Sequence, residues 1–126
     1  MNKLFTALTI VLIMCSLAYA SSVTKDVVGD GNWTTALSSE KGASINVSIG
    51  SINATTDMTI TLQRKLHGDS AWGRDVETWD ITGSSADIES ITTAEPENKS
   101  SYRIGCDAAG DYTSGNCTVR LGGGRK

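Results

Sequence analysis

Histidine, cysteine and proline are scarce in this chain of 126 residues, which holds one histidine, three cysteines and one proline. A single histidine, His67, does not complete a zinc site, and no C-x-x-C motif marks a redox-active cysteine pair. Ser70 lies three residues after His67, but no G-x-S-x-G elbow surrounds it, so a serine hydrolase is not predicted. The sequence therefore predicts a protein that is not an enzyme and that carries no metal and no cofactor.

Clustered positive charge is also lacking. The formal net charge is -3 at pH 7, and the only adjacent basic pair away from the C-terminal end lies in "QRKL". Nucleic acids select proteins with a basic stripe or patch. The sequence therefore predicts no nucleic-acid partner.

Long apolar runs are confined to the first 20 residues, "MNKLFTALTIVLIMCSLAYA". One cation, an apolar stretch and the small residues Ala18 and Ala20 form the pattern of a signal peptide, and we expect cleavage after Ala20. The apolar part is shorter than the roughly 20 residues of a membrane span. A lipoprotein signal at Cys15 is disfavoured because bulky residues precede that cysteine. We expect a secreted, extracellular protein, with the virion and the cell surface as alternatives, and no membrane span after cleavage.

Helical periodicity is missing from the rest of the chain, where short runs of alternating apolar and polar residues are separated by turn-forming residues. Examples of such alternation are Ile45, Val47 and Ile49, and then Met58, Ile60 and Leu62. About seven strands result, which predicts an all-β, single-domain antiparallel β-sandwich, Ig-like or jelly-roll-like, with a small barrel as the alternative. We expect an N-terminal extended segment over 21–31, the sandwich over 32–122 with Pro96 in a loop, and a flexible tail over 123–126.

The two cysteines that follow the leader, Cys106 and Cys117, lie on separate alternating runs, "SYRIGC" and "CTVRL". The ten residues between them are rich in turn formers. Two cysteines in one small secreted domain favour a disulfide. We therefore expect a C-terminal disulfide-linked hairpin, which on the chain-entropy model would stabilise the fold by about 2 to 3 kcal/mol.

Two segments, "TITLQRKLHGDSAWGRDVETW" and then "EPENKSSYRIGCDAAGDYTSGNCTVRLGG", carry a recognisable pattern. They resemble small, largely uncharacterised β-rich proteins of tailed bacteriophages, particularly marine ones, and the resemblance spans roughly residues 43 to 122. It implies a virion-associated or accessory structural module without assigned chemistry. The leader and the cysteine pair point to an exported, phage-derived or phage-carried version of such a module.

All five asparagines that follow the leader begin an N-x-[ST] sequence. Such sequences accept N-linked glycans on exposed surfaces of secreted proteins. The alternative is that Asn, Ser and Thr gather in turns of a polar β-protein. The candidate glycosylation sites are Asn32, Asn46, Asn53, Asn98 and Asn116.

Tryptophans and paired carboxylates are the remaining candidates for binding. Trp33 and Trp72 flank glycine-bearing turns, where an indole can stack on a sugar or anchor a protein contact, or can instead cover the open end of the sandwich. Trp79 shares one face of an alternating run with Ile81 and is expected in the core. Two aspartate pairs could hold calcium in loops, but turn formation is the ordinary explanation and no metal site is predicted; these pairs are Asp26 with Asp30 and Asp107 with Asp111.

Together these observations favour a non-enzymatic, secreted structural or surface β-domain that is related to phages. One alternative is a subunit of an extracellular, N-glycosylated filament in which "SSVTKDVV" completes a neighbour's sheet by strand addition. Another is a module that binds a carbohydrate or a host surface. A protein partner or self-assembly is expected, with a glycan as the further candidate partner.

Overall fold

A computed structural model of the chain describes residues 21–51, 53–84, 88–89, 93–96, 99–107 and 110–123. The predicted leader, the candidate site Asn98 and residues 124–126 of the predicted tail lie outside these ranges. No α-helix occurs in the described ranges, and none of their residues form a helix that could cross a membrane. The strands are β1 (Ser21–Val27), β2 (Leu37–Glu40), β3 (Ser44–Gly50), β4 (Asp57–Leu66), β5 (Arg74–Thr82), β6 (Ile88–Glu89), β7 (Thr93–Ala94), β8 (Lys99–Gly105), β9 (Tyr112–Ser114) and β10 (Cys117–Gly123).

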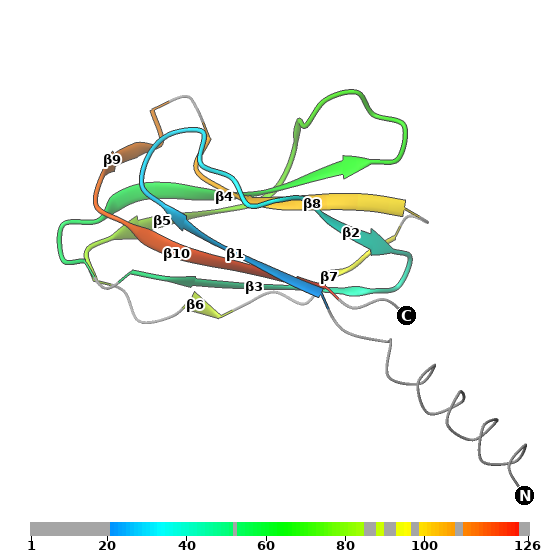
Figure 1. Ribbon diagram of the computed structural model, residues 1–126, viewed down its shortest axis with the longest axis horizontal. Coiled ribbons are helices and arrows are strands. Elements are labelled where there is room, and N and C mark those ends of the chain that lie inside the picture. The colour runs from blue at the N-terminus through cyan, green and yellow to red at the C-terminus, as the bar shows by residue number, and fades with distance from the viewer. Residues whose placement is uncertain are drawn as a thin grey trace, which may run out of the picture.

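The strands form two antiparallel sheets that face each other, as Figure 1 shows. In the first sheet, which we call sheet A, the order is β1-β10-β3-β6, and β7 also pairs with β3. In sheet B the order is β2-β8-β4-β5, and β9 also pairs with β4. The predicted sandwich-like, all-β architecture is confirmed. The strand count is higher than expected because β6, β7 and β9 are short additional pieces.

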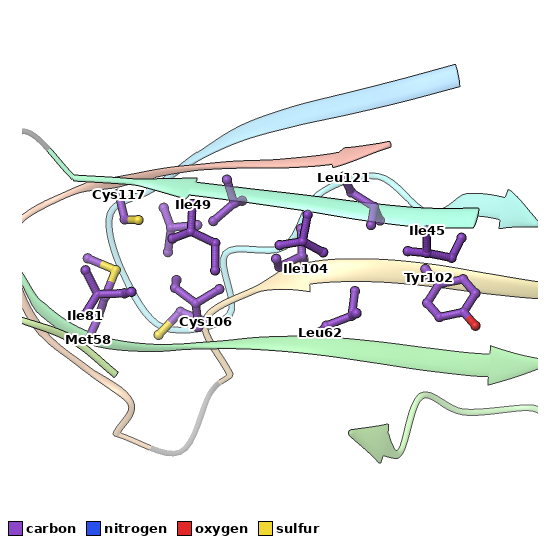
Figure 2. Close-up of a cluster of buried hydrophobic side chains, with 14 of the residues drawn as sticks. Ile45, Ile49, Met58, Leu62, Ile81, Tyr102, Ile104, Cys106, Cys117 and Leu121 are labelled. Carbon is purple, nitrogen blue, oxygen red and sulfur yellow. The ribbon is translucent and has the colours of Figure 1, made fainter. Parts of the chain in front are cut away.

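The core lies between the sheets and is filled by inward-facing residues of β1, β2, β3, β4, β5, β8 and β10 (Figure 2). Burial alternates along β3 and β10, as the sequence predicted, because successive side chains of a strand point to opposite faces. Trp79 is partly buried and packs against this cluster. Its buried members are Val27, Leu37, Ile45, Val47, Ile49, Met58, Ile60, Leu62, Ile81, Tyr102, Ile104, Cys106, Cys117, Val119 and Leu121.

The predicted disulfide-linked hairpin is wrong. Cys106 directly follows β8 of sheet B and Cys117 begins β10 of sheet A, and these two strands do not pair with each other. The segment between them crosses from one sheet to the other, and on the way β9 pairs with β4. Both cysteines are buried free thiols that enter the core from opposite sheets, as Figure 2 shows.

Burial keeps both thiols protonated. It raises the pKa of Cys106 to about 12, with a further contribution from the carboxylates of Asp30, Asp111 and Asp107. It also raises the pKa of Cys117 to about 11, against the opposing effect of a hydrogen bond with the backbone of Gly50. Because the thiolate is the reactive form, neither cysteine is activated as a nucleophile.

The segment predicted to precede the domain is part of it. β1 pairs with β10 along its whole length, from Ser21 opposite Gly123 to Val27 opposite Cys117. Val27 is fully buried, which fixes the end of β1 to the core. Gly123, predicted as the first residue of the tail, is the last residue of β10 and lies opposite Ile45 of β3. The strands of the sandwich therefore run from residue 21 to residue 123.

A buried ion pair joins the two sheets at one end of the core. Glu95 follows β7 of sheet A, and its side chain is 0% exposed, while that of Arg64 on β4 is 16% exposed. Arg64 donates to both carboxylate oxygens, with an Nε to Oε2 distance of 3.1 Å, and Tyr102 of β8 donates its hydroxyl proton to the same carboxylate. This network satisfies a charge that would otherwise be costly to bury.

Candidate functional site

The outward face of sheet B carries the most distinctive side-chain cluster of the described residues. Along β8 the residues Ser101 and Arg103 alternate with buried neighbours and so point outward. On β4, Lys65 lies opposite Ser101 and Gln63 lies opposite Arg103. These four positions form a polar surface across the two central strands of the sheet.

Arg103 brings the two predicted binding tryptophans together. Its guanidinium carbon lies 4.0 Å from the ring centroid of Trp33 and 4.6 Å from that of Trp72. Lys65 Nζ lies 5.9 Å from the centroid of Trp72. Cations over indole faces are attracted by the ring quadrupole. We call Trp33, Arg103 and Trp72 the Trp–Arg stack; it lies on the outer face of sheet B, not over the open end of the sandwich.

Hydrogen bonds hold the guanidinium in place. Gln63 Oε1 accepts from Arg103 Nε at 3.0 Å and from Nη2 at 2.7 Å. Gln63 Nε2 in turn donates to Asp75 Oδ1 at 2.9 Å. Burial lowers the pKa of Arg103, and the nearby carboxylate of Asp107 opposes that effect. Because the acceptor is itself fixed by a second bond, the stack has a defined geometry before any ligand arrives.

Trp33 is positioned by an unusually close backbone approach. It forms an antiparallel bridge with Gly105, and the amide of Cys106 donates to the Asn32 carbonyl at 3.1 Å. A Cβ atom on residue 105 would lie 2.0 Å from the Asn32 oxygen and 2.8 Å from the Trp33 Cα. Only glycine therefore allows the β1–β2 loop to lie against β8.

Trp72 comes from the loop between β4 and β5. That loop is tied to itself, because Asp69 Oδ2 accepts from the Leu66 amide at 3.3 Å and the Asp69 amide donates to the Leu66 carbonyl at 3.1 Å. In Figure 1 this loop rises from sheet B, whereas the β1–β2 loop runs from β1 of sheet A to β2 of sheet B. The two tryptophans thus reach Arg103 from two different loops, the β1–β2 loop and the β4–β5 loop.

A hollow of about 260 Å³ adjoins the stack over β2 and β8. Ser38 of β2 lies opposite Ser101 of β8, and Glu40 lies opposite Lys99. His67 contributes from the β4–β5 loop, and its amide donates to the Lys99 carbonyl at 3.2 Å. The lining is mostly polar and consists of Ser38, Ser39, Glu40, His67, Lys99, Ser100 and Ser101.

The predicted glycosylation sites within the described residues all reach the surface. Asn46 and Asn116 are exposed, and Asn32 and Asn53 are partly exposed. Asn53 Oδ1 accepts from the amide and the hydroxyl of Thr55, at 3.0 Å and 2.9 Å. Asn53 and Thr55, the two residues that define the candidate glycosylation sequence here, therefore also form a hydrogen-bonded turn.

The two members of the first candidate aspartate pair are each engaged in hydrogen bonds. Asp26 Oδ1 accepts from the Thr118 hydroxyl at 2.8 Å on the surface of sheet A. Asp30 Oδ1 accepts from the Tyr112 amide at 2.9 Å, which ties the β1–β2 loop to β9. Among the described residues, no three His, Cys, Asp or Glu side chains come together in a way that could hold a metal ion.

The sequence analysis missed Arg103, Gln63 and the polar lining of the hollow. Outward positions of a strand are polar in most β-proteins, so nothing in the pattern separates these residues from other surface residues. The one usable signal was the position of Arg103 between the apolar residues Tyr102 and Ile104. The alternation of β8 places Arg103 on the outer face. Its partners depend on strand register, which the alternation does not give.

Comparison of the chain with protein-family models, with curated proteins and with solved structures gives no match. The function is therefore argued from the fold and from the outer face of sheet B.

Proposed function

We propose that the chain is an exported, non-enzymatic structural β-domain of jelly-roll type that acts in a phage-related particle or at a cell surface. The observation that carries this proposal is the order of the strands. The pairs are nested along the sequence: β1 pairs with β10, β2 with β8, β3 with β6 and β7, and β4 with β5.

Nested pairing favours a jelly roll over an Ig-like sandwich. An Ig-like sandwich keeps its last two strands side by side in one sheet, whereas β8 and β10 lie in different sheets here. Jelly rolls consist of two sheets built from Greek keys, and they form viral capsid and lectin domains. This use agrees with the resemblance to phage proteins.

Export is compatible with the described part of the fold. Ser21, the residue that follows the predicted cleavage site, pairs with Gly123. Cleavage after Ala20 would thus remove none of the described strands. The surface positions of the described sequons agree with passage through a compartment where glycans are attached.

Purification of particles from the culture medium tests the proposal. Mass spectrometry of density-gradient fractions should find the chain, cut after Ala20, in the same fractions as other particle or envelope proteins. Recovery of the full-length chain only from the cytosol would contradict both export and the structural role.

A filament joined by strand addition is the second candidate, and β1 is the observation that bears on it. β1 is an edge strand whose side chains are mostly exposed, yet it completes its own sheet by pairing with β10. A filament would therefore need β1 to leave β10 and pair with the β10 of a neighbour. Size-exclusion chromatography decides: a filament elutes as a polymer that deletion of residues 21–29 abolishes, whereas a self-contained domain elutes as one small species.

A further inference from the structure

The Trp–Arg stack and the hollow lie near each other on the outer face of sheet B. Ser101, which lines the hollow, lies two residues before Arg103 on β8 and opposite Lys65 on β4. Lys65 in turn lies over the ring of Trp72. Ser101 and Lys65 therefore connect the hollow to the stack along the two central strands.

We propose that this surface is a saccharide-binding site, in which a pyranose ring packs against an indole of the stack and its hydroxyl groups enter the hollow. The proposal goes beyond the structural role above and holds whether or not the chain belongs to a particle.

The lining has the chemistry that a sugar needs. Each serine hydroxyl both donates and accepts hydrogen bonds, as the hydroxyl groups of a sugar do. Ser38 is exposed and Ser101 is partly exposed, so both hydroxyls are within reach of a ligand. Glu40 adds an acceptor and Lys99 adds a donor. A few polar groups beside an aromatic surface are the usual composition of a ligand site.

The indoles offer the apolar part of the site. Trp33 and Trp72 are both partly exposed, although each is contacted by the guanidinium. The bonds from Arg103 to Gln63, and from Gln63 to Asp75, hold the stack without a ligand. A ligand therefore loses little affinity to the ordering of these side chains.

A glycan array tests the proposal on the purified chain that begins at Ser21. The array carries neutral hexose, N-acetylhexosamine and uronic-acid oligosaccharides, and isothermal titration calorimetry measures the best binder. Two variants remove the site in different ways: Trp72→Ala removes one indole, and Ser38→Tyr fills the hollow while keeping a residue that suits a strand. Thr78→Ala, at an exposed position of β5, is the matched control.

We expect at least one oligosaccharide to bind, with affinity lowered tenfold or more by Trp72→Ala and by Ser38→Tyr but unchanged by Thr78→Ala. Circular dichroism should show that all three variants melt near the temperature of the unmodified chain; if Trp72→Ala does not fold, Ser38→Tyr alone decides. The absence of any bound oligosaccharide would overturn the proposal. Binding restricted to acidic sugars would also overturn it if high salt abolishes this binding and both site variants retain it, because charge alone would then explain the binding.

Discussion

The buried carboxylate of Glu95 provides the sharpest test of how the two sheets are held together. Glu95→Gln keeps the shape of the side chain but removes its charge, which removes the carboxylate that the guanidinium of Arg64 contacts. Loss of one partner from a buried ion pair costs about 3 to 5 kcal/mol. Because the Arg64 side chain is 16% exposed, some water reaches it, and we expect a value near the lower limit, about 3 kcal/mol.

Such a loss is large for a domain of this size. A change of 1 kcal/mol moves the melting temperature of a domain of 60 to 100 residues by about 4 to 8 °C, so Glu95→Gln should lower it by about 12 °C or more. Urea unfolding, followed by tryptophan fluorescence, measures the free energy directly. Glu40→Gln makes the same chemical change at an exposed position and is the control.

A double variant separates the ion pair from the rest of the network. Arg64→Met combined with Glu95→Gln removes both charges, so it should be less destabilised than the sum of the two single variants. If Glu95→Gln unfolds within about 0.5 kcal/mol of Glu40→Gln, the usual range for surface changes, the network does not hold the sheets together and the reasoning fails.

Three further predictions concern packing, ionisation and modification. Gly105→Ala should destabilise the chain by about 1 to 3 kcal/mol or more, since its Cβ would lie 2.0 Å from the Asn32 oxygen; Gly73→Ala, which meets nothing within 4 Å, should unfold like the unmodified chain in urea. Burial raises the pKa of Cys106 to about 12 and of Cys117 to about 11 from the ordinary value of 9.0. The contribution of the two buried thiols to the free energy of unfolding is therefore fully present below pH 9 and is lost as the pH rises from 9 through these raised pKa values. Unfolding in urea at rising pH measures this decline. If the free energy of unfolding stays the same across that range, the two cysteines are not buried free thiols. Treatment of the secreted chain with an N-glycosidase should lower its mass; unchanged peptides at every sequon would mean that the asparagines only form turns.

Alternation along the strands predicted which side chains face the core but not which strands pair. Tyr102, Ile104 and Cys106 were assigned to one face and Cys117, Val119 and Leu121 to another, and all six are buried as expected. The predicted hairpin was wrong because a strand with an apolar inward face can belong to either sheet of a sandwich. The pairing of β9 with β4 keeps the chain in sheet B after Cys106, and the pairing of β10 with β1 and β3 places Cys117 in sheet A.

The candidate site and the ion pair were partly predictable for a related reason. Trp33 and Trp72 were found because aromatic residues beside glycine turns are uncommon on a polar surface. Their contact with Arg103 depends on register and on a loop that folds back, neither of which leaves a local pattern. The ion pair left no local signal, because Arg64 lies 31 residues before Glu95 in the sequence.

The most direct test of the central claim, an exported structural β-domain, is the intact mass of the protein recovered from outside the cell, with the cytosol measured in parallel. Export predicts a chain that begins at Ser21, is enriched outside the cell and differs from its calculated mass only by attached glycans. A chain that retains residues 1 to 20 and stays in the cytosol would contradict the account.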